Sequence, residues 1–267
     1  MIAGSRPRIG IVGFGLIGSY VYRQIVTRPE LGLEVAFVHN RSPGRVAHLP
    51  PELVLDNLGE FAARRPDLVV ELAHPSVTVV HGAAFLHHTD YMPLSLTAFA
   101  DAELERTLLD TAAAHGTRLY IPHGAVVGLG AIGEGRDQWD EVTMVMRKSP
   151  SSIDFSDHPT LTAEKILSDT VIYDGPTRGI CPLFPRNVNS HAALALGGIG
   201  FDRTRSVLIA VTDSHTSDIE IIARGEAADL TIRRVSPMKG VSGMFTLISA
   251  LASVVRAKSP GAGLQIC

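Results

Sequence analysis

The chain contains very little cysteine. Its 267 residues include two, Cys181 in the middle and Cys267 at the end, so a framework of disulfide bonds is not expected. Scarce cysteine is typical of a reducing compartment, and we expect a cytoplasmic protein. Long apolar runs are also lacking, since none approaches the roughly 20 residues that a membrane helix needs. Glycines and Arg8 interrupt the first apolar residues, so we expect neither a signal peptide nor a membrane partner.

An excess of positive charge is missing as well. The chain has 24 Lys and Arg against 27 Asp and Glu, which gives a formal net charge of −3. Without a basic footprint, we expect no nucleic acid as a partner. The hydrophobic content of 45% and the charged content of 19% are typical of a compact globular enzyme rather than a disordered chain. The length suffices for one large domain or two modest ones.

The histidines lack the spacing of a metal site. His81, His87 and His88 fall on or at the end of one expected helix. They do not show the pairing at four residues with a nearby acid that is typical of a zinc helix. A solvated helix face explains them, and we expect no metal.

A glycine pattern does stand out, directly after the first expected strand. The apolar residues 9–12 lead into Gly-Phe-Gly-Leu-Ile-Gly at 13–18, and a helical pattern follows. In a dinucleotide-binding loop the first glycine permits a tight turn, the second lets the backbone approach a pyrophosphate, and the third lets the helix pack closely on the strand. The helix N-terminus then offers N–H groups to the phosphates. The predicted cofactor-binding residues of this loop are Gly13, Gly15, Leu16, Ile17 and Gly18.

Strand-like and helix-like segments alternate from residue 8 to about 121. We expect further strands at 33–38, 67–72, 91–95 and 117–121, and helices near 58–64, 79–87 and 101–114. Such alternation is typical of a parallel, doubly wound sheet. Asp101 is the expected N-cap of the last of these helices.

After Pro122 the pattern changes to consecutive strands. Strands are expected at 141–147, 206–212, 219–224 and 229–235, and helices at 160–168, 190–196 and 244–257. Alternating apolar and polar residues with short turns indicate a mostly antiparallel sheet. The predicted fold class is therefore α/β, a Rossmann dinucleotide-binding domain plus an α+β domain. The expected boundaries are 1–122 for the Rossmann NAD(P)-binding domain, 123–240 for an α+β substrate and oligomerisation domain, and 241–267 for a C-terminal helix that returns to the first domain.

The end of the second strand bears on the choice of cofactor. An acid there would bond the ribose 2′-hydroxyl of NAD, but this chain has His-Asn-Arg-Ser at 39–42. Arg41 with Ser42 is suited to a 2′-phosphate, so we favour NADP over NAD, with Asn40 in the same loop. The alternative is that Arg41 is a solvated loop residue and that the protein binds both cofactors. His74 follows the third strand and is either near the cofactor or an ordinary loop residue.

Two further segments carry candidate polar groups. His123 lies in a loop of small residues at 122–129, where a nicotinamide ring could approach the backbone. It either faces substrate or is structural. Asn187 and Asn189 flank a helix start, where each can cap the helix or bond a carboxamide or carboxylate.

Taken together, these segments resemble the L-aspartate dehydrogenase family, both its bacterial type and its animal relatives. The resemblance spans nearly the whole chain. It rests on the glycine loop at 13–18, Ser-Leu-Thr-Ala-Phe-Ala-Asp at 95–101, Tyr-Ile-Pro-His-Gly-Ala-Val-Val-Gly-Leu at 120–129 and Phe-Pro-Arg-Asn-Val-Asn at 184–189. It implies oxidation of L-aspartate with NAD or NADP to iminosuccinate, which hydrolyses to oxaloacetate and ammonia. It also implies that Ala125 and Asn189 contact the cofactor. The expected partner is a small amino-acid or keto-acid substrate, and we expect a homodimer.

The chain also departs from that family. Aligned without gaps, Ile219 stands where the family has its catalytic histidine, Gly130 stands at an expected aspartate, and His123 at an expected serine. The acid/base group is therefore sought among other histidines, since imidazole titrates nearest neutral pH. His123 and His215 are the predicted catalytic residues, with His191 as a further candidate. Another imine or carbonyl reductase, or a nucleotide-binding sensor without activity, remain the alternative functions.

Overall fold

In a computed structural model, which describes residues 6–239 and 242–258, the chain forms two compact units. The first consists of Met1–Leu94, Leu108–Pro122 and Ala250–Cys267, and the second of Ser95–Thr107 and His123–Ser249. Cys267 lies outside the described residues.

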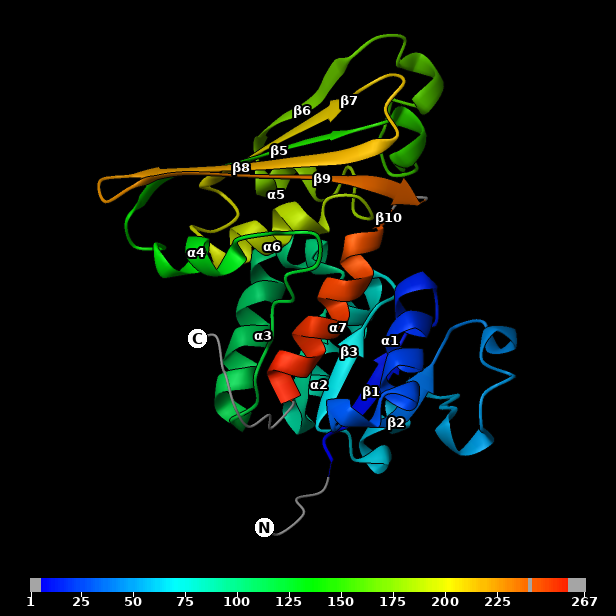
Figure 1. Ribbon diagram of the computed structural model, residues 1–267. Coiled ribbons are helices and arrows are strands. Elements are labelled where there is room, and N and C mark those ends of the chain that lie inside the picture. Colours follow the sequence, from blue (N-terminus) through cyan, green and yellow to red (C-terminus); the bar gives the residue numbers. More distant parts are fainter. Residues whose placement is uncertain (1–5, 240–241, 259–267) are drawn as a thin grey trace. The chain divides into compact units, whose positions relative to one another are not determined.

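The first unit is built on a four-stranded parallel sheet, as the sequence predicted. The strand order is β2-β1-β3-β4. On one face, Ile9 and Ile11 pack with residues of α1 and with Ala250 and Val254 of α7. Helix α2 covers the other face (Figure 1). There the ring centre of Phe85 lies 5.1 Å from that of Tyr91. The elements are β1 (Arg8–Val12), α1 (Leu16–Thr27), β2 (Glu34–His39), β3 (Leu68–Glu71), α2 (Pro75–His88) and β4 (Asp90–Pro93), together with the parts of α3 (Ala102–His115) and α7 (Met244–Lys258) that start at Leu108 and Ala250.

The expected strand at 117–121 was wrong. The segment makes only an isolated bridge between Leu119 and Tyr91. The pairing stops on both sides for physical reasons. The Asp90 carboxylate accepts the N–H of Arg118 at 2.8 Å, and β4 ends at Pro93, which has no N–H to extend the ladder. The expected helix near 58–64 is a 3-10 helix. The predicted cap of α3 is confirmed, since the Asp101 side chain accepts two backbone N–H groups.

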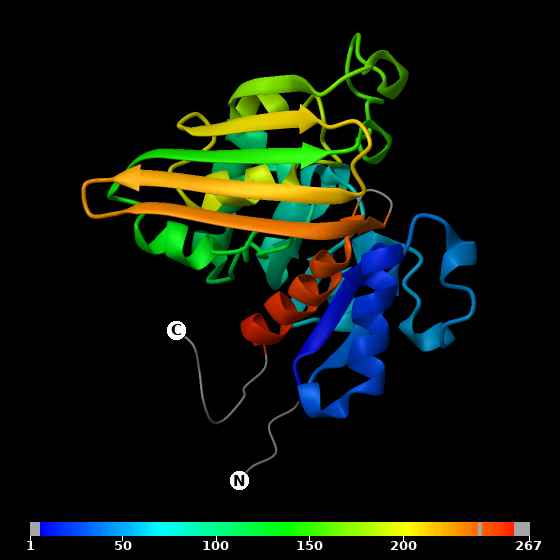
Figure 2. The ribbon, with the colours of Figure 1, turned by 45° about the horizontal axis from the view of Figure 1, so that its top comes forward.

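The second unit contains a six-stranded sheet in the order β10-β9-β8-β5-β7-β6. Every neighbouring pair is antiparallel except β5 with β7, so the predicted mostly antiparallel sheet is confirmed. Figures 1 and 2 show the strands side by side, with the short helices α4, α5 and α6 on one face. The bounds are α4 (Leu129–Glu134), β5 (Trp139–Lys148), β6 (Thr170–Pro176), α5 (Thr177–Ile180), α6 (Asn189–Gly197), β7 (Thr204–Ala210), β8 (Thr216–Gly225), β9 (Asp229–Lys239) and β10 (Ser242–Gly243).

Several elements of this unit were not predicted correctly. The expected helix at 160–168 forms only a short 3-10 turn, Ala163–Lys165. Its residues are largely exposed, so no buried apolar face stabilises a longer helix. The sequence predicts no element over α4, which contains two glycines. It is helical because Leu129 and Ile132 are buried and the Trp139 indole donates to the carbonyl of Ile132 at 2.9 Å. Strand β6 was missed.

The C-terminal helix α7 is held in the first unit by a partly buried ion pair. Lys258 Nζ lies 2.6 Å from Asp90 Oδ2. Residues of this helix from Ala250 onward belong to the first unit, and Ala250 and Val254 are fully buried in its core. Among residues 6–239 and 242–258, no helix is both long and apolar enough to cross a membrane.

Candidate functional site

The glycine loop between β1 and α1 has a geometry that only glycine satisfies at two positions. Gly13 has φ +99°, and a Cβ there would lie 2.7 Å from the carbonyl oxygen of Leu72. A Cβ on Gly18 would lie 2.0 Å from the carbonyl oxygen of Gly13. Gly15 differs, because a Cβ there would meet no protein atom within 4 Å. Space is therefore left above Gly15, where a dinucleotide-binding loop admits a pyrophosphate.

The start of α1 offers donors to that space. Gly15 is the N-cap residue, and no side chain caps the helix. The first N–H groups of a helix have no partner within it, and the helix dipole favours an anion there. The N–H groups of Leu16 and Ile17 therefore fit the phosphates of a dinucleotide.

The segment after β2 is fixed by Asn40. Its Oδ1 accepts the N–H of Phe14 at 2.9 Å, and its Nδ2 donates to the carbonyl of Ser42 at 3.0 Å. Asn40 thus ties this segment to the glycine loop. Arg41 and Ser42 are exposed beside it, and within the described chain Arg41 has no side-chain partner. A free guanidinium in this place suits a 2′-phosphate.

His74 has a local structural role. Its Nδ1 accepts the N–H of Ser76 at 3.2 Å, which caps α2. The buried carboxylate of Glu71 accepts the N–H groups of Ala73 and His74 at 2.6 and 2.8 Å. Together these bonds fix the turn at the carboxyl end of β3, on the same sheet edge as the glycine loop.

In the second unit, two segments of the family resemblance meet at the start of α6. The Oδ1 of Asn189 accepts the N–H of Thr97 at 3.3 Å, and the Thr97 hydroxyl donates to the carbonyl of Pro185 at 2.9 Å. Within the described residues the Nδ2 of Asn189 has no hydrogen-bond partner, so it can donate to a ligand. Asn187 is structural, because its side chain bonds the backbone of Asp154 and Ser152.

The small-residue loop ahead of α4 contains a turn at Gly124 and Ala125. The N–H of Val126 donates to the carbonyl of His123 at 2.8 Å, and Gly124 has φ +54°. Gly128, with φ +81°, has no room for a side chain, since a Cβ would lie 2.1 Å from the Ile232 side chain of β9. The loop therefore lies against the helix-covered face of the sheet, with Ala125 and His123 half-buried.

The three candidate histidines have different surroundings. His123 is half-buried in the loop just described, and His215 is exposed in the turn between β7 and β8. His191 is fully buried on α6, and its Nδ1 lies 2.9 Å from the hydroxyl of Ser206. Burial, with a contribution from the charge of Lys148, lowers the pKa of His191 to about 3. His191 is therefore neutral near pH 7 and is a poor proton carrier, contrary to its listing among the acid/base candidates.

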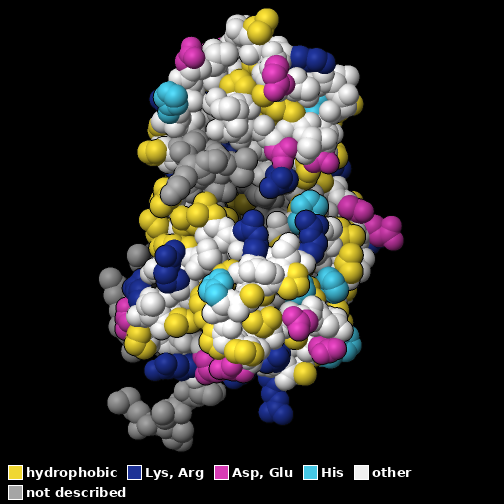
Figure 3. Space-filling view, turned by 90° about the vertical axis from the view of Figure 1, so that its right-hand side faces the viewer, with side chains coloured by type: hydrophobic (Ala, Val, Ile, Leu, Met, Phe, Trp, Pro, Cys, Tyr) yellow, Lys and Arg dark blue, Asp and Glu magenta, His cyan; other side chains and the backbone are white. Residues whose placement is uncertain are grey.

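Of the other histidines, His87 lies close to two more, with its ring centre 4.7 Å from that of His88 and 3.9 Å from that of His115. Figure 3 shows histidine side chains on one face of the molecule, among hydrophobic and charged ones. Over the described ranges, no three His, Cys, Asp or Glu side chains gather as a metal ion would require.

Ile219 lies in the core of the second sheet. It is 3% exposed and pairs with Met146 of β5 on one side and Arg234 of β9 on the other. Its side chain shares the helix-covered face with Ile221 and Ala223, as the alternation of β8 predicted. A histidine side chain at position 219 would be buried on the same face and would not be exposed to solvent as an acid/base group.

Two cations on that face, Lys148 and Arg234, were not predicted as functional residues from the sequence. Lys148 is 5% exposed, and burial, together with the charge of Arg234, lowers its pKa to about 8. Burial also lowers the pKa of Arg234, which the carboxylate of Asp218 partly offsets. A signal was present, because Val142, Met144, Met146 and Lys148 occupy one face of an alternating strand and place a cation where an apolar residue is expected.

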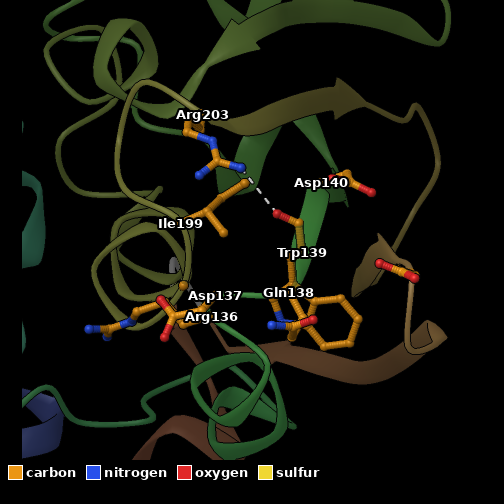
Figure 4. A pocket seen from close by; sticks show the side chains of 9 residues that line it. Arg136, Asp137, Gln138, Trp139, Asp140, Ile199 and Arg203 are labelled. Atoms are coloured by element: carbon orange, nitrogen blue, oxygen red, sulfur yellow. Dashed lines mark hydrogen bonds between the residues drawn. The ribbon is translucent and has the colours of Figure 1, made fainter.

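A surface cavity of about 510 Å³ opens elsewhere in the second unit (Figure 4). Its lining is mostly polar, and Arg203 donates to the carbonyl of Trp139 at 3.1 Å across it. None of the residues predicted from the sequence lines this cavity. The lining residues are Arg136, Asp137, Gln138, Trp139, Asp140, Gly198, Ile199, Arg203 and Glu226.

Comparison with known families divides the chain in two. Residues 13–122 match the family described as homoserine dehydrogenase, NAD binding domain, and residues 132–257 match that described as aspartate dehydrogenase, C-terminal. The first match begins at the first glycine of the loop.

Full-length relatives give the same result. The chain is 34% identical to the aspartate dehydrogenase domain-containing protein of Xenopus tropicalis over 98% of both chains. It is 31% identical to the L-aspartate dehydrogenase of Methanosarcina acetivorans, over 95% of this chain and 97% of that one. Among solved structures, the aspartate dehydrogenase of Thermotoga maritima is similar with a TM-score of 0.71 and 20% identity, covering 94% of both chains. The last similarity concerns the fold.

Proposed function

Because the chain belongs to the aspartate dehydrogenase family, we propose that it oxidises L-aspartate with NAD(P)+ to iminosuccinate, NAD(P)H and a proton. Water then hydrolyses the imine to oxaloacetate and ammonia. The observation that carries this proposal is the glycine loop. It leaves open space over Gly15 in a chain that is similar to aspartate dehydrogenases along almost its whole length.

The first unit holds the cofactor in this proposal. The bound nicotinamide supplies hydride transfer at its C4 atom. The pyrophosphate lies against Gly13, Gly15 and Gly18 and accepts the N–H groups of Leu16 and Ile17. Asn40 fixes the loop, while Arg41 and Ser42 bond the 2′-phosphate of NADP, the favoured cofactor. His74 lines the same sheet edge, where ligands of open α/β sheets bind.

The second unit supplies groups for substrate and nicotinamide. Ala125 and Asn189 are the proposed cofactor-contacting residues of this unit, as the family resemblance implies. His123 and His215 are the proposed proton carriers: one takes the proton that leaves the substrate nitrogen as the imine forms. His191, which stays neutral, is not a proton carrier in this proposal.

We also propose the domain boundaries 1–122, 123–240 and 241–267, a homodimer and a cytoplasmic location. Scarce cysteine and the buried free thiol of Cys181 support the location. The dimer is supported by the sheet face opposite α6, where Val171 and Val235 are 56% and 54% exposed. Exposed apolar side chains on a flat sheet are typical of an interaction surface.

The test is steady-state formation of NADPH and NADH with L-aspartate. His123→Ala and His215→Ala are compared with wild type and with His87→Ala, an exposed histidine of α2 that serves as control. Loss of a proton carrier should lower kcat/KM by roughly 10²- to 10⁴-fold, whereas His87→Ala should not. Tight NADP binding without turnover of L-aspartate would refute the proposed substrate. Full activity in both histidine variants would refute the assignment of the proton carriers.

A further inference from the structure

The helix-covered face of the second sheet carries three polar groups at related positions: Lys148 and His191 are buried, and Arg234 is partly buried with its Nε out of contact with solvent. Arg234 of β9 is opposite Ile219 of β8, and Ile219 is opposite Met146 of β5. Lys148 follows Met146 by two residues and therefore lies on the same face of β5. His191 of α6 reaches this face at Ser206 of β7, with its Nδ1 2.9 Å from the Ser206 hydroxyl. Besides burial, the charge of Arg234 lowers the pKa of Lys148, and the charge of Lys148 lowers the pKa of His191. The groups therefore share one electrostatic environment.

These groups lack partners. Over the described residues, the buried His191 Nε2 and Arg234 Nε have no hydrogen-bond partner, and no carboxylate there forms an ion pair with Lys148. Asp218 is the acid whose charge acts on the pKa of Arg234. Its carboxylate, however, accepts two hydrogen bonds from the guanidinium of Arg233, at 3.0 Å from Nε and 2.8 Å from Nη2. Asp218 pairs with Arg147 on β5, so it points to the opposite face. Buried cations without an anion are strongly unfavourable unless a ligand supplies one.

The orientation of Arg234 indicates what kind of anion fits. Its Nη1 donates to the hydroxyl of Ser236 at 2.6 Å, and its guanidinium lies 5.9 Å from the ring centre of Phe245. These contacts hold the plane of the guanidinium. The edge formed by Nε and Nη2 stays without a partner among the described residues. That edge is the part of arginine that binds a carboxylate through two parallel hydrogen bonds.

We propose that Arg234 and Lys148 bind the carboxylate groups of a dicarboxylic substrate. Arg234 grips one carboxylate through its open edge, and Lys148 pairs with the other as a point charge. This inference rests on the proposed function and names the residues that would distinguish aspartate from a neutral amino acid. An amino acid with a neutral side chain leaves at least one of these two cations unpaired, and sites of this kind discriminate strongly.

The experiment measures binding of succinate, a dicarboxylate that has no amino group to oxidise. Calorimetry with the NADPH-loaded protein compares wild type, Lys148→Met and Arg234→Met. Arg147→Met is the matched control, since it removes a cation from the adjacent position of β5 but on the opposite face, where Arg147 pairs with Glu220 at 3.3 Å. Because hydrogen bonds to charged groups are strong, each test variant should bind succinate about 10- to 100-fold more weakly. The control should stay within about twofold.

The outcomes separate this inference from the proposed function. Succinate binding that is unchanged in Lys148→Met and Arg234→Met overturns the site, even if wild-type protein oxidises L-aspartate. Loss of succinate binding in both, with the control intact, supports the site even if no aspartate turnover is found. Succinamate, which has one carboxylate, tests the need for two charges. Equal affinity of wild type for succinate and succinamate would overturn the dicarboxylate claim.

Discussion

Replacing Lys148 with methionine should make the protein more stable, although the lysine is proposed to bind substrate. Methionine has a similar length and no charge, so it fills the same space on the buried face of β5. The pKa of Lys148 is about 8 in the folded chain against an ordinary value of 10.5. The folded state therefore disfavours the ammonium form, chiefly because burial removes it from water.

The size and sign of the effect follow from these two pKa values. A depressed lysine pKa means that the unfolded chain holds the proton more tightly, so stability rises with pH between the two values. Below pH 8 both states are charged and the full penalty, about 3 kcal/mol, applies. Lys148→Met should thus raise the free energy of unfolding by about 3 kcal/mol at pH 7. The gain should shrink to roughly 2 kcal/mol at pH 9 and nearly vanish by pH 10.5.

The assay is urea unfolding of wild type and Lys148→Met at several values between pH 7 and pH 9.5. The difference between the two proteins is used, so groups that titrate equally in both cancel. His191, whose pKa is about 3, stays neutral throughout this range. A variant that is less stable than wild type at pH 7, or a difference independent of pH, would refute the view that Lys148 is a buried and uncompensated cation.

Three further predictions concern the cofactor loop. Gly15→Ala should weaken NADP binding by at least about tenfold with little change in stability, because the new methyl group meets only the proposed pyrophosphate. The control for the calorimetry is Gly44→Ala, where an added Cβ likewise meets no protein atom within 4 Å. Gly18→Ala should instead lower the unfolding free energy by about 2 kcal/mol or more in urea titration, since its Cβ would collide with the Gly13 carbonyl. Arg41→Ala should weaken NADPH binding by about tenfold more than NADH binding, as charge-assisted bonds to phosphate are strong. Equal losses for both cofactors would argue against a 2′-phosphate site.

The glycine loop at 13–18 is a local feature of the chain, and for that reason its conformation could be predicted from the sequence. The turn at Gly13 and the approach of Gly18 to the Gly13 carbonyl are contacts within six residues, which a glycine pattern records directly. The alternation of strands and helices likewise determined the parallel sheet, and the period-two pattern of β8 placed Ile219 on the buried face.

The fate of the segment at 117–121 was decided by tertiary structure. Its pattern is that of a strand, yet the Asp90 carboxylate takes its amide and Pro93 ends the neighbouring ladder. Segment 160–168 does not form the expected helix, because its residues are largely exposed and no packed face stabilises it. Helix α4 exists because Trp139 and α6 pack on glycine-containing chain that has low helix propensity by itself.

The proposed carboxylate-binding site also depends on residues that are distant in the sequence. Lys148 and Arg234 lie 86 positions apart in the numbering, and β8 stands between their strands in the sheet. Sequence alone could show a lysine out of pattern on β5, but not that a second cation, Arg234, acts on it or that Asp218 lies on the opposite face. Burial, strand order and register decide those facts, because the energy of a charge depends on its surroundings in space rather than on its position in the chain.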